Sequence, residues 1–533
     1  MHQILVIAWR EMTRVRKRFG GGASPIAVIL LVAGLGLSVF ALRSSVALGT
    51  GLYRVAVSGA VPPLQDSRFS VINTDAAQGK ALLEQHAVDV WIDGAQVQAR
   101  EDDRSLFAMR ALKQDLEVQE LERIGGSYTA GAAFPLQVGI NYFGAVPSAG
   151  QTRPEEVIIP SLTPPPAPFT QVLVSMLYII PITFISIFFT SSFMDEKVNR
   201  RLSILLSAPI TPFQIIMGKM LPYASFALVT TALIAWLTHT NVALALAIFA
   251  PTILFIFAIY LMVPLLYRTF KDTTFIAMLV TTLTTSYLIF PAMFTNTNDL
   301  AYISPLTLAV KMYRNEAFGW REYLFPSLPM AAIFGLAMFA GTRMLNEEYL
   351  MGYRPITRKI TDAIYLMMAH ISPYISVPLW SLLVIPGVYM TQVVFLAFAT
   401  NLPLRILLVA VLAAAALVEE VVKSIGIVVL VEHGVVKSKR QLLMLAFLSA
   451  LGFLIGEKLI LLVSLGVVQQ APVSGALFGA GIFLLIPLAV HFACTTAVIF
   501  LKSKARLPYP LALAVGTLLH FAYNWIVTRG GLR

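Results

Sequence analysis

The segment ALVEEVVKSIG places three ionisable side chains inside an apolar run that covers residues 406–431. A charge near the centre of a membrane-spanning helix costs about 2.5–3.5 kcal/mol on insertion scales. Helical spacing puts Glu419 and Glu420 within reach of Lys423, which lies four and three residues further on. The single lysine can neutralise only one of the two carboxylates, and the second one indicates a role beyond internal pairing.

Three later apolar segments also carry polar side chains, namely Glu457 in 441–466, His491 in 476–501, and His520 with Asn524 in 508–527. The polar residues lie about 10 to 17 positions from the predicted cytosolic edges, which is roughly 15–26 Å along a helix. His520 and Asn524 share one helical face because they are four residues apart. Independent structural pairs would not need a common depth, so we expect one polar site inside a helix bundle.

Three kinds of chemistry suit such a site. A carboxylate in a low-dielectric environment can activate a water, while a histidine and an amide stabilise the oxyanion. The same carboxylates and imidazoles could instead hold a divalent metal with an open water position. The candidate ligands are Glu420, Glu457, His491 and His520. A proton relay for transport is the third possibility, and spacing alone does not choose among them.

The composition predicts that these segments cross a membrane. Of the 533 residues, 57% are hydrophobic and 13% are charged, whereas soluble domains carry about 25% charged residues. Runs of about 18 apolar residues can span a bilayer as helices. About eleven runs qualify: 25–42, 168–191, 220–238, 242–265, 273–294, 324–345, 377–399, 406–431, 441–466, 476–501 and 508–527. The fold class is therefore an all-α polytopic membrane protein with about eleven spans.

The distribution of charge predicts the topology. Residues 45–167 hold 14 of the 28 acidic residues and 9 of the 39 basic ones, while the remaining loops are basic. Basic loops stay in the cytosol, so residues 45–167 of this multi-pass protein are expected to be extracytoplasmic and the N-terminus cytosolic. Residues 1–19 read as an amphipathic helix on the membrane surface. The net charge of +11 thus reflects cytosolic loops and not a nucleic-acid partner.

These patterns divide the chain into five regions. Within the external region, residues 53–59 and 69–73 read as strands, and residues 75–94 as a helix followed by a strand, which predicts an α/β insert after the first span. The regions are a cytosolic helix and first span (1–44), the extracytoplasmic α/β insert (45–167), a five-span core (168–345), a cytosolic connector (346–376) and the polar C-terminal bundle (377–533).

Residues 191–223, SSFMDEKVNRRLSILLSAPITPFQIIMGKMLPY, carry the first resemblance to a known family. An acidic–basic stretch, an LLS-P segment and a GK pair before the next span resemble the type-2 ABC transporter permeases, particularly the sodium-exporter-like members. The matching residues are Asp195, Glu196, Lys197, Leu205, Pro209, Gly218 and Lys219. In the family this loop couples the permease to an ATPase subunit, and its amphipathic pattern suits docking into a groove of a soluble partner. The chain has no phosphate-binding loop of its own, so the resemblance implies a separate ATPase subunit and a second permease copy.

Four elements in the C-terminal region carry the second resemblance. EEVVK, Phe453 to Glu457, the isolated His491, and HFAYN match in order the PrsW family of intramembrane proteases, which belongs with the CAAX-type (CPBP) endopeptidases. The resemblance implies that Glu419 or Glu420 activates the water, that histidines assist, and that an amide supports the oxyanion. By this carry-over the catalytic residues are Glu419, Glu420, Glu457, His491, His520 and Asn524, with Lys423 supporting. Lys458 departs from the family pattern, and the resemblance leaves a metal open.

Together, the resemblances imply a permease subunit of an ATP-driven exporter fused to an intramembrane peptidase that couples peptide processing to export. The expected partners are the ATPase, a second permease copy, membrane lipid, and a peptide or membrane-protein substrate. The alternative is a transporter alone. In that case the polar residues of the last spans form an ion or proton path, or an inactive scaffold.

Overall fold

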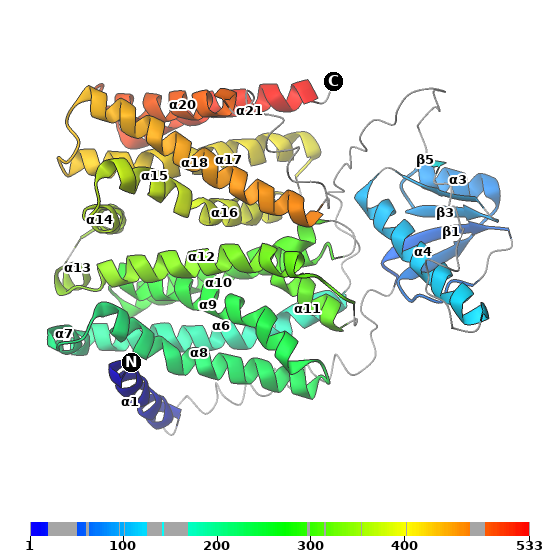
Figure 1. Cartoon of the computed structure of the whole chain (residues 1–533), viewed down its shortest axis with the longest axis horizontal. Coiled ribbons are helices and arrows are strands. Elements are labelled where there is room, and N and C mark those ends of the chain that lie inside the picture. Colours follow the sequence, from blue (N-terminus) through cyan, green and yellow to red (C-terminus); the bar gives the residue numbers. More distant parts are fainter. Residues whose placement is uncertain are drawn as a thin grey trace. The chain divides into compact units, whose positions relative to one another are not determined.

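A computed structural model gives the fold of the chain (Figure 1). The first predicted span (25–42) and the proline-rich segment that precedes the second span lie outside the described residues. The structure describes residues 2–19, 51–59, 63–94, 96–100, 102–124, 141–142, 169–295, 299–313, 316–352, 354–400, 402–468 and 485–531. These residues form two compact units, which are considered separately below.

The larger unit is all-helical and comprises residues 1–35, 178–288 and 318–533. Its N-terminal helices are α1 (His2–Phe19), α6 (Phe169–Val198), α7 (Arg201–Ser207), α8 (Pro212–Leu237), α9 (Val242–Leu266), α10 (Phe270–Ala292) and α12 (Trp320–Met344). The later helices are α13 (Glu347–Met351), α14 (Ile356–Met368), α15 (Pro373–Leu383), α16 (Ile385–Ala399), α17 (Leu404–Glu432), α18 (Lys439–Val468), α20 (Leu485–Ser503) and α21 (Tyr509–Gly531).

Within the described residues, nine helical segments are long and apolar enough to cross a membrane. They confirm a polytopic all-α membrane protein. The prediction of eleven spans included 406–431, which forms α17, a helix of 29 residues. This helix is long enough to cross a bilayer. It is not counted among the nine apolar segments, because it carries the charged residues Glu419, Glu420 and Lys423.

Local sequence signals set the helix boundaries. Thr211 caps α8 with a capping box, since its hydroxyl accepts from the Gln214 amide and the Gln214 side chain accepts from the Thr211 amide. Pro212 follows at the first helical position, where its missing N–H costs nothing. Asn241 caps α9 in the same manner by accepting from the Leu244 amide. These caps fix the turns between the long helices that run side by side in Figure 1.

The C-terminal helices pack closely where small residues meet. α18 crosses α15 at Gly452, where an added Cβ would come within 2.4 Å of the Pro378 carbonyl oxygen. α20 and α21 pack against each other, and both pack against α17. Glycine is therefore required at the α15–α18 crossing, and this crossing holds α18 beside the polar helix α17.

α14 joins the two predicted membrane regions. It contacts α9 and α12 as well as α15 and α17, and its Ile364 and Met368 pack with hydrophobic residues of the latter two helices. In Figure 1 it is seen end-on between α13 and α15. His433, at the C-terminal end of α17, stacks on Tyr365 of α14 with ring centroids 3.9 Å apart. Helices from 168–345 and from 377–533 thus belong to one compact unit.

The smaller unit contains a five-stranded sheet of order β2-β1-β3-β4-β5. Its strands are β1 (Tyr53–Ser58), β2 (Phe69–Asn73), β3 (Val90–Asp93), β4 (Gln96–Ala99) and β5 (Asn141–Tyr142); its helices are α3 (Ala76–Glu84), α4 (Asp103–Ile124), η1 (Asp299–Ile303) and α11 (Pro305–Tyr313). β1 is parallel to both β2 and β3, with Val55 opposite Val71 and Val90, whereas β3 and β4 are antiparallel. The two predicted strands and the predicted helix–strand pair are confirmed as β1, β2, α3 and β3.

The two faces of this sheet have separate hydrophobic cores. α4 covers one face, where Ala108 and Leu112 pack against Val55 and Val90. The other face carries Ala56 and Trp91, which pack with Leu83 of α3. Alternation along β1 sends neighbouring side chains to opposite faces, so both cores are built from one strand. The sheet thus supplies an α/β unit within an otherwise helical protein.

Candidate active site

α17 carries the three ionisable residues at the centre of the candidate site, Glu419, Glu420 and Lys423. Lys423 Nζ lies 2.5 Å from Glu420 Oε1, and both side chains are completely buried. Successive helical residues point about 100° apart, so Glu419 turns toward a different neighbour and its side chain keeps 16% of its exposure. The structure therefore resolves which carboxylate pairs with the lysine: Glu420 does, at a spacing of three residues.

His520 of α21 lies between the two glutamates. Its Nδ1 is 2.9 Å from Glu420 Oε1, and its Nε2 is 3.6 Å from Glu419 Oε2. The imidazole is 2% exposed. The contact with Glu420 is close but is not aligned as a hydrogen bond; a proton on Nδ1 would face the anionic Glu420 and leave the Nε2 lone pair directed toward Glu419. A buried carboxylate that orients a histidine in this way sets both its tautomer and its ring plane.

His491 of α20 takes the opposite tautomer. Lys423 Nζ lies 2.8 Å from His491 Nδ1, and the lysine ion-paired with Glu420 can only donate there. The neutral ring then carries its proton on Nε2, which is 3.4 Å from Glu457 Oε2. The Phe453 ring contacts His491 at a centroid distance of 5.4 Å and lies under the Lys423 ammonium at 4.9 Å. Lys423 thus links a carboxylate to an imidazole through donated protons.

Glu457 of α18 completes the cluster at its accessible edge. Its side chain retains 40% of its exposure, compared with none for Glu420. Lys458 pairs with Glu457 Oε1 at 2.8 Å. Lys458, the departure from the family pattern, is therefore a neighbour of the site and makes no direct contact with Glu419 or Glu420 in the described structure.

The structure adds polar neighbours that the sequence analysis missed. Gln392 of α16 donates its side-chain amide to Glu419 Oε1 at 3.2 Å. Ser424 shares a hydrogen bond of 2.9 Å with the Tyr509 hydroxyl, and Ser449 donates to the Lys423 carbonyl at 2.7 Å. Gln392 was detectable, because it is an amide in the middle of the apolar run 377–399. The serines gave no comparable signal, since membrane helices often satisfy serine hydroxyls within their own backbone.

Asn524 is the one predicted catalytic residue that stays apart. It lies one turn beyond His520 on α21 and is half-buried. Within the described residues its side chain makes no hydrogen bond or ion pair with the cluster. Glu419, Glu420, Lys423, Glu457, His491 and His520 are brought together, and a role of Asn524 toward an oxyanion stays a prediction.

A divalent metal fits only part of this cluster. Glu419, His491 and His520 each offer a ligand atom within 4.8 Å of the other two. The 3.6 Å between Glu419 Oε2 and His520 Nε2 is close to the separation of about 3.4 Å that tetrahedral zinc imposes. His491 does not fit, because the Lys423 ammonium occupies its Nδ1 lone pair and its Nε2 carries the proton. Only Glu419 and His520 are therefore suited to bind a metal, and two ligands fall short of the three that a catalytic zinc site uses.

A water molecule matches the three groups better than a metal. Atoms up to 4.8 Å apart can all lie about 2.8 Å from one central oxygen, an ordinary hydrogen-bond distance. Glu419 and His520 Nε2 would accept the two water protons, and the His491 Nε2–H, whose contact with Glu457 is long at 3.4 Å, would be shared between Glu457 and the water oxygen. Such a water would be oriented by three side chains and placed next to a carboxylate that can remove its proton.

The residues predicted to couple to an ATPase lie in two different environments. Glu196 and Lys219 are buried and pair at 2.8 Å, and Lys219 also pairs with Glu11 of α1 at 3.1 Å. Arg14 completes this network by pairing with Glu196. Burial lowers the pKa of Arg14, but the hydrogen bond and charge of Glu196 outweigh it and raise the pKa overall. Although residues 1–19 have the pattern of a helix on the membrane surface, Arg14 pairs with a buried carboxylate and does not face lipid phosphates.

Gly218 explains how α1 reaches this network. A Cβ at Gly218 would lie 2.7 Å from the Ile7 Cβ, so only glycine lets α1 pack this closely on α8. Lys197 is also buried, and it donates to the carbonyls of Pro264 and Tyr267 at 2.6 and 2.8 Å. Asp195 instead lies near the surface and contacts Arg201 at 3.8 Å. The acidic–basic stretch therefore includes side chains that hold helices together.

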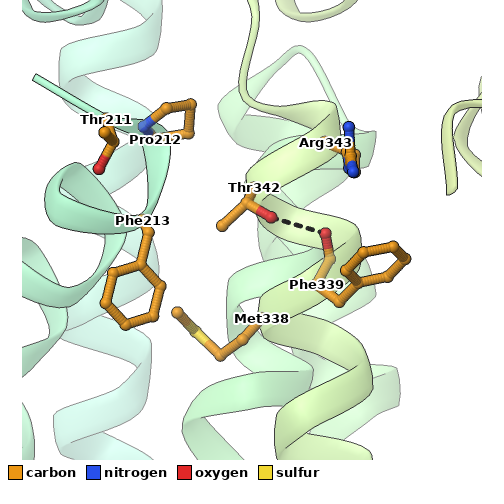
Figure 2. Close-up of a pocket in the computed structure, with 7 residues that line it drawn as sticks. All are labelled: Thr211, Pro212, Phe213, Met338, Phe339, Thr342 and Arg343. Atoms are coloured by element: carbon orange, nitrogen blue, oxygen red, sulfur yellow. Dashed lines mark hydrogen bonds between the residues drawn. The ribbon is translucent and has the colours of Figure 1, made fainter. Parts of the chain in front are cut away.

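The surface of the predicted coupling segment is formed by α7 and the start of α8. Ile204 is 70% exposed and Phe213 is 49% exposed, while Leu205 is half-buried and Pro209 is exposed. Figure 2 shows an adjoining open cavity of about 540 Å³ between the start of α8 and the end of α12. Its lining residues are Thr211, Pro212, Phe213, Met338, Phe339, Thr342 and Arg343. Phe213 is therefore both an exposed apolar side chain of this segment and part of a concave, mainly apolar surface.

Comparison with known proteins finds no match: no family model, no curated protein and no solved structure is similar to this chain.

Proposed function

We propose that the C-terminal helices form an intramembrane endopeptidase that hydrolyses peptide bonds with a carboxylate-activated water. One observation carries this proposal: Glu419, His491 and His520 converge within 4.8 Å of one another from three helices, α17, α20 and α21. Placing ionisable groups at this depth is costly, and the arrangement supplies a base, an acceptor and a donor around one water-sized position. The order of the motifs, which resembles the PrsW-type proteases, agrees with it.

The surroundings of the two adjacent glutamates give them different roles. Glu419 keeps partial exposure and one long contact to His520, so we assign it as the general base. Glu420 is buried and held by Lys423 and His520, so we assign it as a positioning residue that fixes the imidazole. His520 and His491 would orient the water, and Glu457 would fix the second imidazole.

In the proposed reaction, water is added across the peptide C–N bond. Glu419 removes one water proton as the oxygen attacks the carbonyl carbon, which forms a tetrahedral oxyanion. Collapse of this intermediate breaks the C–N bond, and the proton held by Glu419 passes to the leaving amine nitrogen. The products are a new carboxyl terminus, which contains the water oxygen, and a new amino terminus.

We further propose that residues 168–345 are the permease core of an ATP-driven exporter of the cytoplasmic membrane. The exposed Ile204 of α7, together with Phe213, which lines the cavity of Figure 2, would accept a separate ATPase subunit. The buried network of Glu11, Glu196 and Lys219 would carry motion from that segment to α1 and α6. Residues 45–167 would be extracytoplasmic, and a second permease copy would complete the exporter.

A proton path is the second candidate function, and a specific observation favours it. Contacts of 3.4, 2.8, 2.5, 2.9 and 3.6 Å connect Glu457, His491, Lys423, Glu420, His520 and Glu419 in an unbroken series. Such a chain of ionisable groups could pass protons between the accessible edge and the interior. It requires no cleaved product, and this difference separates the two functions.

A comparison of membrane proteomes tests the peptidase. Cells that express wild type, Glu419→Gln or Glu432→Gln would be searched for new peptide termini within membrane segments. Glu432 is the matched control, because it lies at the end of the same helix and pairs with Lys502 outside the cluster. We expect fragments in wild type and Glu432→Gln that are absent from Glu419→Gln at equal protein level. Identical termini in all three would exclude the peptidase and favour the proton path.

A further inference from the structure

Three cationic side chains, Lys197, Arg268 and Lys359, lie near the C-terminal ends of α6 and α9 and on the neighbouring helix α14. Lys197 is 2% exposed and Lys359 is 3% exposed, whereas Arg268 is exposed. Lys197 Nζ lies 2.8 Å from the carbonyl oxygen of Tyr267, the residue before Arg268, and α14, which carries Lys359, packs on α9. The three charges therefore repel one another. Neither the candidate active site nor the proposed coupling segment uses Lys359 or Arg268.

The two buried lysines differ in how their ammonium groups are satisfied. Lys197 Nζ donates to the carbonyls of Pro264, Leu265 and Tyr267 at 2.6, 3.4 and 2.8 Å. Lys359 Nζ is buried and has no hydrogen-bond partner. No carboxylate in the described chain pairs with either lysine. Lys359 therefore brings three donors into the interior with nothing to accept them.

The side chains next to Lys359 do not remove this deficit. The Tyr349 ring faces the ammonium at 5.7 Å, but the Tyr349 hydroxyl donates to the Lys359 carbonyl and makes no hydrogen bond with Nζ. Burial, followed by repulsion from Arg268, lowers the pKa of Lys359. An isolated buried charge costs several kcal/mol, and even a neutral amine would leave its N–H groups unsatisfied. An anion at this position would satisfy the donors and neutralise the repulsion.

We propose that Lys359, Lys197 and Arg268 form a binding site for a phosphate-type oxyanion. Lys359 would be the central donor, Lys197 would contribute positive charge from the end of α6, and Arg268 would close the site from the exposed side. Lysine and arginine are the side chains that bind phosphate oxygens in proteins.

The position of the site limits the source of the phosphate. Lys197 is the penultimate residue of the candidate span Met176–Val198, and Arg268 lies between the spans Val242–Leu266 and Phe270–Ala292. Both residues are thus at the end of membrane-crossing helices, the level at which lipid headgroups lie. The phosphate could belong to an anionic lipid or be free in solution, and the chemistry of recognition is the same for both.

A bound phosphate would have a structural consequence. Lys359 belongs to α14, which packs on α9 and α12 as well as on α15 and α17, whereas Lys197 and Arg268 belong to the end of α6 and the turn after α9. The anion would therefore bridge the connector helix to the N-terminal membrane helices. Its occupancy would stabilise the packing of α14.

The experiment uses the full chain, purified in detergent and stripped of lipid. The midpoint of thermal unfolding is measured with dihexanoyl phosphatidylglycerol, with the zwitterionic dihexanoyl phosphatidylcholine, and with inorganic phosphate. Lys359→Met keeps the aliphatic stem and removes the donors, and Lys504→Met is the matched control because Lys504 is exposed in another helix-connecting turn. Native mass spectrometry counts bound lipid in each variant as a second readout.

We expect phosphatidylglycerol or inorganic phosphate to raise the unfolding midpoint of wild type and Lys504→Met. Lys359→Met should lose the shift and bind the same probe at least tenfold more weakly. A shift with phosphatidylglycerol that inorganic phosphate does not reproduce assigns the site to a lipid headgroup, and a shift with inorganic phosphate alone assigns it to free phosphate. No shift in wild type, or an equal shift and equal lipid count in Lys359→Met, would overturn the proposal.

Discussion

Replacing Lys423 with methionine removes the cation between Glu420 and His491. Glu420 and Lys423 have no exposed side-chain surface and lie 2.5 Å apart, so the substitution leaves a carboxylate buried with only His520 beside it. Removing one partner of a buried ion pair costs about 3–5 kcal/mol, because the other charge stays buried and uncompensated. We therefore expect Lys423→Met to reduce the free energy of unfolding by about that amount.

The double variant Glu420→Gln/Lys423→Met separates this explanation from a loss of packing. With both charges removed, no uncompensated carboxylate remains, so the double variant should regain about 2–3 kcal/mol relative to the sum of the single variants. Glu432 and Lys502 provide the matched control pair. They join α17 to α20 at 3.1 Å, whereas Glu420 and Lys423 both lie on α17, and they keep 48% and 28% of their exposure. Exposed pairs contribute about 0–1 kcal/mol, and Lys502→Met should change stability by no more than this.

Both cycles can be measured by unfolding the purified chain in mixed micelles with increasing denaturing detergent, followed by circular dichroism. The expected coupling for Glu420 and Lys423 is well above the error of about 0.5 kcal/mol that additive sites show. Additivity within that error would refute the conclusion that Lys423 is the counter-ion of Glu420. A large coupling at the control pair would show that the assay does not report burial.

Three further predictions concern separate parts of the chain. Gly452→Ala should lower the free energy of unfolding by about 1–3 kcal/mol, because the new methyl group overpacks against the Pro378 backbone. Gly335→Ala is the control: no atom lies within 4 Å of its new Cβ, so it should be neutral or stabilising by up to about 1 kcal/mol. Thermal unfolding of both variants checks this, and equal destabilisation would contradict it. Burial raises the pKa of Asp102, but the Ser105 amide and Arg100 outweigh this effect and lower the pKa overall. The ionised carboxylate therefore stabilises the start of α4 when the pH is above its unfolded pKa of about 3.9. This stabilisation is lost as the pH falls through the lower folded pKa. Asp102→Ala should weaken α4 by about 1 kcal/mol at pH 7 and by less in acid, as followed by hydrogen exchange of the first turn, and a difference that does not depend on pH would count against this role. Lys458→Gln should retain peptidase activity within about tenfold, because Lys458 contacts only Glu457 within the cluster; loss of activity equal to that of a base variant would place it in the mechanism.

The sequence was sufficient to predict the gathering of polar groups, because it depends on helix length and depth. Glu457, His491 and His520 each lie far inside an apolar helix, and a shared site was the economical explanation. It could not tell which glutamate binds Lys423, since spacings of three and four residues are both compatible with a helix. That choice depends on how α17 is rotated toward α20 and α21, which side-chain packing determines.

The N-terminal half shows where charge patterns mislead. Glu196, Lys197 and Lys219 have the composition of a solvent-exposed loop, yet they are buried. Their partners, Glu11 and the carbonyls that follow Pro264, are distant in the sequence. Only the close approach of α1 to α8 at Gly218 brings Glu11 to them. Gln392 was detectable as an amide within an apolar run, but its contact with Glu419 was not, because that contact requires α16 to pack on α17.

The central claim is that Glu419 activates a water for peptide hydrolysis. The most direct measurement is cleavage of a membrane peptide by the purified chain in vesicles prepared in ¹⁸O-labelled water, with wild type and Glu419→Gln compared at equal amounts. The account predicts one heavy oxygen in each new carboxyl terminus and a loss of rate of about 10²–10⁴-fold in the variant, the usual contribution of a general base. Cleavage at the wild-type rate by Glu419→Gln, or no cleavage by correctly folded wild type with any membrane peptide tested, would contradict it.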